Sequence, residues 1–231
     1  MYFKSRVEAG QKLAQELKNY QKEKTTILAL SDGGVVVGAQ IAAQLRCSIT
    51  MLLIEPIRLP GEPEPVAVIT QDGSFTYNHM YSTGQLEEFQ AEYYHFIEQA
   101  KLDKLDEIHR LLGKGGLIRK DLLQDHNIIL VSDGLNSGFS LEAAMEYLKP
   151  LRVKRLIVAV PIASVPAVDR MHLLADEIHC LSVIENYMET DHYYEDNATP
   201  SHEAIVGTIE NIVQNWHEAS GIKPAISKPK A

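Results

Sequence analysis

The sequence has little cysteine. Cys47 and Cys180 are its only two, and both stand in apolar surroundings far apart in the chain. This usage is typical of a reduced intracellular protein and excludes a disulfide-stapled scaffold. Two such cysteines offer no zinc pattern, and the nine histidines do not fall at metal-ligand spacing. The residues alone therefore identify no metal ligands.

Basic residues are in the minority. The chain has 22 Lys and Arg against 31 Asp and Glu, which gives a net charge of -9. The negative electrostatic field of such a chain repels polyanions, which argues against nucleic acid or an anionic membrane as the main partner. The chain also lacks an N-terminal apolar run of signal-peptide length and any apolar run of the roughly eighteen residues that a membrane span requires. We therefore predict a cytoplasmic protein.

Hydrophobic residues make up 45% of the 231 residues and charged residues 23%, which is the range of globular proteins. A fold of this size hides roughly 70% of the surface that its unfolded chain exposes, so it needs no covalent staples. We expect one domain over residues 1–219. Residues 220–231 are rich in Pro and Lys and predict a flexible C-terminal tail.

Short apolar runs alternate with amphipathic segments along the chain. The runs predict strands at 25–30, 49–54, 127–131, 154–161 and 177–183. The amphipathic segments predict helices at 5–21, 35–45, 86–112, 141–148, 167–174 and 201–217. This alternation indicates an α/β fold with a mainly parallel sheet and helices on both of its faces.

One stretch interrupts the alternation. Residues 55–65 contain Pro56, Pro60, Gly61, Pro63 and Pro65, which are residue types that break strand ladders. We expect residues 55–85 to form a mobile excursion without regular strand pairing.

Ligands of open parallel sheets bind at the carboxyl ends of the strands, so the loops after the strands are the candidate sites. We call residues 132–140 the signature loop: Ser132, Asp133, Gly134, Leu135, Asn136, Ser137, Gly138, Phe139 and Ser140. Its small residues let backbone N–H groups close around a phosphate, and a helix N-terminus follows. An ordinary turn at Asp133 and Gly134, with Ser137 as a helix cap, explains the same residues, and both interpretations stay open.

A second glycine-rich loop follows the first strand: Ser31, Asp32, Gly33 and Gly34. It carries the acidic Asp32 at a position where an anion-binding loop would have a basic residue. Two interpretations are therefore open: a plain strand-to-helix turn capped by Asp32, or a loop that contacts a ligand. Neither loop has the lysine of a Walker A motif or the three-glycine dinucleotide pattern, which excludes those two classes. A hydrolase with Ser137 as nucleophile lacks the first glycine of the G-x-S-x-G elbow and an obvious base.

Several motifs fall in one order along the chain. They lie at residues 3–14, 28–38, 60–64, 128–140, 158–161, 175–177 and 194–196. In this order and spacing, residues 3–216 resemble the type I phosphoribosyltransferase-like family. The resemblance implies a Rossmann-like core with a small hood, here about residues 1–20 and 184–217.

The resemblance also implies an activity and its residues. The reaction transfers a 5-phosphoribosyl group from phosphoribosyl pyrophosphate to a nitrogen acceptor, with Mg²⁺ accompanying the donor. Asp133 would hold a ribose hydroxyl, residues 136–140 would bind the 5-phosphate, and residues 31–34 would shape the pyrophosphate loop. Arg58 would stand in for the family's basic catalytic residues. The implied partner is a phosphorylated small molecule, and a homo-oligomer is left open.

The chain departs from the family at three donor-binding positions. Ser132 replaces the first of two acids, Ser31 and Asp32 replace Pro-Arg, and Glu55 with Pro56 replaces Arg-Lys. Two unit charges about 5 Å apart at an effective dielectric near 20 interact by roughly 3 kcal/mol, so exchanging a base for an acid costs about 6 kcal/mol per ligand charge. The losses favour an alternative: a non-catalytic regulatory protein that binds a nucleotide or sugar phosphate.

Overall fold

Five parallel strands form the central sheet in the order β3-β2-β7-β8-β9. They are β3 (Ser48–Met51), β2 (Thr25–Ala29), β7 (Asn127–Val131), β8 (Arg155–Ser164) and β9 (Glu177–Ile184). The computed structural model describes residues 2–112, 118 and 123–220. The predicted tail lies outside these residues except for Ser220. The parallel pairing confirms the predicted sheet.

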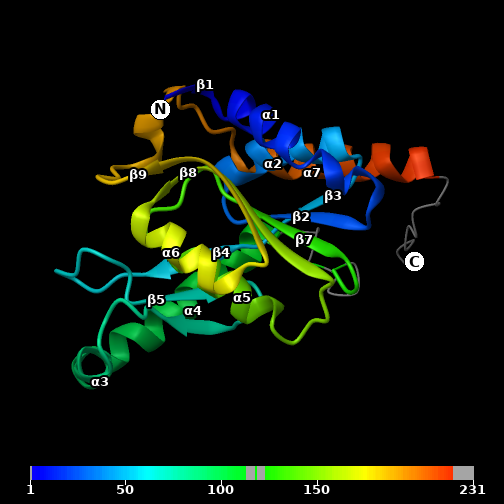
Figure 1. The fold of residues 1–231 in the computed structure, drawn as a ribbon. Coiled ribbons are helices and arrows are strands. Elements are labelled where there is room, and N and C mark those ends of the chain that lie inside the picture. The colour runs from blue at the N-terminus through cyan, green and yellow to red at the C-terminus, as the bar shows by residue number, and fades with distance from the viewer. Residues whose placement is uncertain (1, 113–117, 119–122, 221–231) are drawn as a thin grey trace, which may run out of the picture.

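Helices cover both faces of this sheet, as predicted (Figure 1). The helices on one face are α1 (Arg6–Glu16), α2 (Asp32–Leu45) and α7 (His202–Ser220). The other face carries α5 (Phe139–Leu148) and α6 (Val165–Leu174). The α/β class predicted from the alternation is therefore confirmed.

Alternate strand residues supply the two cores. Ile27 and Ile129 pack into the cluster beneath α1, α2 and α7. Their neighbours Leu28 and Leu130 point to the opposite side and pack with α5 and α6. Because successive strand side chains alternate between faces, a strand buried on both sides must be apolar throughout. This explains why these strands are continuous apolar runs in the sequence.

The structure contradicts the prediction that residues 55–85 form no regular strand pairing. A three-stranded antiparallel sheet contains β4 (Ile54–Ile57), β5 (Ala67–Thr70) and β6 (Phe75–Tyr77). Pro56 lies within β4 and pairs with Val68. It is tolerated because β4 is an edge strand, where a missing N–H group costs no ladder hydrogen bond.

The predicted helix 86–112 is two helices, α3 (Thr83–Glu92) and α4 (Tyr94–Leu112). The break at Tyr93 contains neither Gly nor Pro. It brings Phe89 of α3 and Ile97 of α4 into the same apolar cluster against the antiparallel sheet. The break therefore results from the packing of both helices against the antiparallel sheet and not from a helix-breaking residue.

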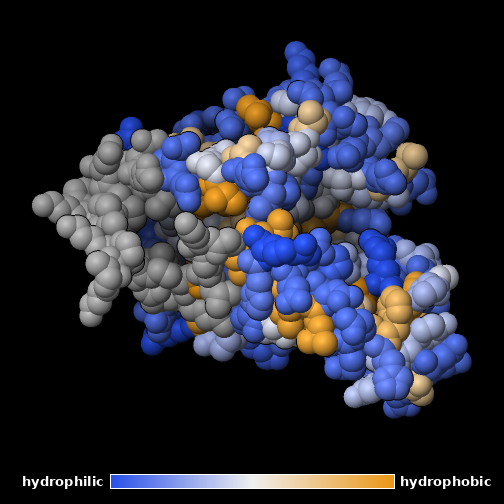
Figure 2. Space-filling model, turned by 180° about the vertical axis from the view of Figure 1, so that it is seen from behind, coloured by the Kyte–Doolittle hydropathy of each residue, from blue (hydrophilic) through white to orange (hydrophobic). Residues whose placement is uncertain are grey.

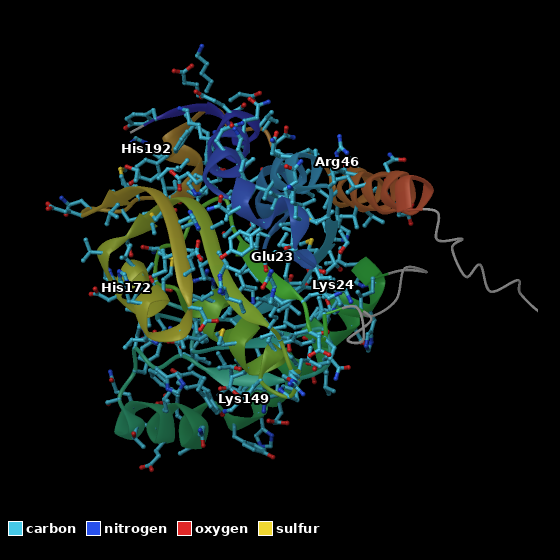
Figure 3. The ribbon with its side chains drawn as sticks, turned by 45° about the vertical axis from the view of Figure 1, so that its right-hand side comes forward. Glu23, Lys24, Arg46, Lys149, His172 and His192 are labelled. Carbon is cyan, nitrogen blue, oxygen red and sulfur yellow. The ribbon has the colours of Figure 1, made fainter. Side chains whose placement is uncertain are left out.

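The N-terminal segment lies beside a late segment of the chain (Figure 1). Strand β1 (Phe3–Ser5) pairs in parallel with β10 (Tyr194–Asp196), which follows the short 3-10 helix η4 (Thr190–Tyr193). Tyr2 Oη and His192 Nε2 are 2.8 Å apart. Figure 3 shows His192 at the upper left, near this N-terminal strand. This pairing joins the two segments named as the hood, while the domain boundaries stay a prediction.

Within the described residues, no helix is both long and apolar enough to cross a membrane. The face shown in Figure 2 is mostly hydrophilic, with hydrophobic patches of limited extent.

Candidate functional site

The two predicted loops meet at the carboxyl edge of the sheet, because β2 and β7 are neighbouring strands. Ser31 Oγ donates a hydrogen bond to Asp133 Oδ1 at 2.7 Å. A Cβ atom on Gly34 would lie only 2.8 Å from the carbonyl oxygen of Val131, the residue that precedes the signature loop. Gly34 therefore permits the close approach of the second loop to the first.

The signature loop leaves a run of backbone donors unpaired. The N–H groups of residues 136–140 donate to no partner in the described part of the chain. Those of Leu141 and Glu142 return to the carbonyl of Gly138, at 3.1 and 3.2 Å. The run ends in the first turn of α5, where the helix dipole is positive. The arrangement offers an anion several donors and a favourable potential.

Gly138 sets the direction of this loop. Its φ of +73° is left-handed, a conformation that glycine adopts without strain. A Cβ atom there would lie 3.1 Å from Cβ of Arg170, which comes from α6. Arg170 forms an ion pair with Glu142. The structure thus brings a guanidinium-bearing side chain to the loop that no sequence motif indicated.

The Asp133 carboxylate is buried and already occupied. Only 8% of the residue is exposed. Oδ2 accepts a hydrogen bond from Arg6 Nε at 2.8 Å, and Oδ1 accepts the one from Ser31. The Tyr194 hydroxyl donates to the Asp133 carbonyl at 2.5 Å. A Cβ atom on Gly33 would overlap the carboxylate, so Gly33 packs directly against it.

Arg6 joins this carboxylate to the hood. It is 3% exposed, and it donates to the Asn197 carbonyl at 2.9 Å and to the Asp191 carboxylate. Burial alone would lower the pKa of Arg6, but its hydrogen bonds with Asp133 and Asp191 outweigh burial and raise the pKa above its ordinary value. The guanidinium also lies 4.7 Å from the ring centre of Tyr194. Arg6 belongs to the family-like segment 3–14, but no sequence pattern indicated a role for it.

Ser132 is buried, and the backbone of Gly134 packs against Tyr187 and Thr190. Ser132 is 4% exposed, and its hydroxyl donates to the Gly134 carbonyl at 2.9 Å. A Cβ atom on Gly134 would overlap the hydroxyl of Tyr187, which lies 2.9 Å from Thr190 Oγ1. Burial raises the pKa of Tyr187 to about 12, so this hydroxyl keeps its proton at neutral pH. Leu135 donates its N–H to the Ile162 carbonyl at 3.1 Å.

The second loop differs from the predicted turn. Helix α2 begins at Asp32, so both glycines lie in its first turn. Ser31, rather than Asp32, is the cap, because its hydroxyl accepts the Gly34 N–H at 2.9 Å. Asp32 Oδ1 is instead 3.2 Å from Nδ1 of His202, and Nε2 of that histidine is 3.2 Å from the Leu111 carbonyl.

The described residues contain no group of three His, Cys, Asp or Glu placed to hold a metal ion. Asp133 fits poorly as a ligand, since both of its oxygens accept internal hydrogen bonds. Asp32 is half-buried, and among the described residues only Oδ1 of its carboxylate has a hydrogen-bond partner, His202. That suits Mg²⁺ when substrate phosphates supply the other ligands. The magnesium implied by the resemblance stays a prediction, with Asp32 as its candidate protein ligand.

Arg58 lies apart from these contacts. It is exposed just after β4, and it forms no ion pair with any described residue. Glu55 of the same strand pairs with Lys104 of α4 at 3.0 Å. The strand itself reaches the signature loop, because Ile54 packs in the cluster that contains Phe139.

Ser137 has no hydrogen bond to a histidine or carboxylate among residues that the structure describes. A serine nucleophile needs such a base. The geometry therefore gives no support to a hydrolase with Ser137 as its nucleophile.

The fold is a parallel α/β sheet with glycine-rich loops at its carboxyl edge, and comparison with known families assigns the chain to one of them. Residues 4–196 match the model of the phosphoribosyl transferase domain, so the chain belongs to that family.

Relatives support this assignment. Proteins from two strains of Mycobacterium tuberculosis, provisionally named phosphoribosyl transferases Rv0571c and MT0597, are each 25% identical over 228 residues. The match covers 98% of this chain and 51% of each relative, so the chain spans about half the length of these curated relatives. The crystal structure of TT1426 from Thermus thermophilus is 26% identical, with a TM-score of 0.67 over 94% of this chain and 99% of that one.

Proposed function

We propose that this chain binds phosphoribosyl pyrophosphate at the signature loop and transfers its 5-phosphoribosyl group to a nitrogen acceptor. One observation carries the proposal: the run of unpaired N–H groups from residues 136–140 at the start of α5. Unpaired backbone donors are rare in folded proteins unless water or a ligand satisfies them. Family membership identifies phosphoribosyl groups as the ligand class to test first.

The chain's own residues would act on the donor by position and charge. The amides of residues 136–140 would bind the 5-phosphate, and the hydroxyls of Ser137 and Ser140 would add donors. The helix N-terminus would offset part of the phosphate charge. Mg²⁺ bound with the donor would neutralise charge on the leaving pyrophosphate. Fixing the donor in this way lowers the barrier by orientation.

Two contacts favour a second candidate, a sugar-phosphate or nucleotide binding protein without transferase activity. Glu55 stands where the family has basic residues, and it pairs with Lys104 at 3.0 Å. Asp133 is held by Arg6 at 2.8 Å instead of facing a ligand. The first position thus lacks the base that the resemblance assigns to the donor, and the second contact occupies the carboxylate assigned to the ribose, while the unpaired amides of residues 136–140 remain.

Calorimetric titration of phosphoribosyl pyrophosphate, with and without Mg²⁺, tests the proposal. We expect Asn136→Asp to weaken binding at least tenfold, because a charge about 5 Å from a phosphate charge repels it by roughly 3 kcal/mol. Asn19→Asp is the matched control, since both asparagines are exposed and both changes add one charge. Asn19 belongs to η1 (Lys18–Lys22), which precedes the amino end of β2, whereas the signature loop follows the carboxyl end of the neighbouring strand β7.

A screen of nucleobases followed for pyrophosphate release then separates the two candidates. Release with one base establishes the transferase. Tight binding without release under every condition assigns the sugar-phosphate binding role. Equal affinity of Asn136→Asp and wild type would show that the donor does not bind at residues 136–140.

A further inference from the structure

Asp133 is the one carboxylate within the signature loop. A carboxylate that holds a sugar diol must present its oxygens to the ligand. Here Oδ2 accepts from Arg6 at 2.8 Å and Oδ1 accepts from Ser31 at 2.7 Å. Gly33 packs against the same group, and the side chain is 11% exposed. The carboxylate therefore lies against Arg6, Ser31 and Gly33 and is largely shielded from solvent.

The neighbouring position offers no substitute. Ser132 is 4% exposed, and its hydroxyl donates to the carbonyl of Gly134 at 2.9 Å. A serine hydroxyl in this state has its single proton engaged. The first two side chains of the loop are thus both buried and hydrogen-bonded within the protein.

Displacing Arg6 from Asp133 would be costly. The guanidinium is 3% exposed, and its remaining partners are Asp191 and the Asn197 carbonyl. Separating Arg6 from Asp133 would leave the buried Asp133 carboxylate without a countercharge, which is strongly unfavourable. Sugar hydroxyls are neutral and already well hydrated, so they would not repay this loss. The ion pair between Arg6 and Asp133 therefore attaches the hood to the signature loop.

We propose that this site binds phosphomonoesters through their phosphate group and makes no specific contact with the cis-diol of ribose. Asp133 then serves as a positioning residue that holds residues 191–197 of the hood through Arg6. The inference rests on the proposed phosphate site at residues 136–140 and gives Asp133 a different role from the ribose contact that the resemblance implies. Its consequence is that 2-deoxyribose 5-phosphate is a ligand as good as ribose 5-phosphate.

Calorimetry on the full chain with ribose 5-phosphate, 2-deoxyribose 5-phosphate and inorganic phosphate tests this. We expect the dissociation constants of the two sugar phosphates to agree within about threefold, with inorganic phosphate competing against both. A preference of tenfold or more for ribose 5-phosphate, about 1.4 kcal/mol, would overturn the inference and leave the phosphate site standing. Absence of binding by all three would overturn both the inference and the proposed function.

The variant Asp133→Asn separates the two roles of Asp133. We expect faster hydrogen exchange over residues 191–197, because the hood loses its charged anchor, and an unchanged ratio between the two sugar phosphates. If the variant instead lowers affinity for ribose 5-phosphate alone and leaves hood exchange as in wild type, Asp133 contacts the sugar and the inference is wrong. Should the variant fail to fold, the wild-type ratio decides by itself.

Discussion

Arg6 and Asp133 lie 127 positions apart in the sequence and form a buried ion pair with 2.8 Å between Nε and Oδ2. Arg6→Ala leaves the Asp133 carboxylate buried with one partner fewer. Removing one member of a buried pair destabilises a protein by about 3–5 kcal/mol, so we expect a loss of this size in urea denaturation. The exposed pair of Arg152 with Asp125 is the control.

For Arg152→Ala we expect a change below about 1 kcal/mol, because exposed ion pairs are screened by solvent. Equal stability losses for Arg6→Ala and Arg152→Ala would show that the Arg6 pair does not anchor the hood.

Gly33 tests the packing around the same carboxylate. A Cβ atom there would overlap Asp133 and lie 2.7 Å from Arg6 Nε. We expect Gly33→Ala to destabilise the protein by about 1–3 kcal/mol through overpacking. Gly84→Ala is the control, since Gly84 also lies in the first turn of a helix but has open space around it. Thermal unfolding of both variants measures the difference, and a stable Gly33→Ala would contradict the packing.

Sequence patterns predict the layers of this fold well and its long-range contacts poorly. Ile27 and Leu28 reveal a strand buried on both faces because local residues determine the pattern. Pro56 led to the wrong prediction of an unpaired segment, because a residue type alone does not tell whether a strand lies at the edge of a sheet.

The site shows the same division. The small residues of the signature loop and the following helix were visible in the sequence, and the structure places them at the expected edge. Arg170 was not found, because it lies outside every motif and reaches Gly138 only through the packing of α6 on α5. The occupation of Asp133 by Arg6 depends on the pairing of β1 with β10, which no local signal indicates.

Cys47 provides a probe of folding. It is buried, and burial raises the pKa of its thiol to about 12. Only the thiolate reacts with alkylating agents, so we expect no labelling by iodoacetamide at about pH 7.5 in the native state and full labelling in urea. Mass spectrometry of the Cys47 peptide measures this. Rapid native labelling would show that the helix α2 end opens readily.

His126 makes stability depend on pH. Burial lowers the pKa of His126 below its ordinary value of 6.5, with Lys24 adding to the effect. The unfolded chain therefore binds a proton that the folded chain resists, and stability falls as pH decreases below about 6.5. We expect His126→Gln to flatten the fall in the free energy of unfolding between about pH 7 and pH 5. An identical slope in the variant would exclude His126 as its source.

The position of a bound phosphate tests the central claim most directly. A crystal structure with ribose 5-phosphate should place the phosphate oxygens about 2.7–3.2 Å from the backbone nitrogens of residues 137–140. A phosphate bound elsewhere, or amides of residues 137–140 turned toward internal acceptors, would contradict the account.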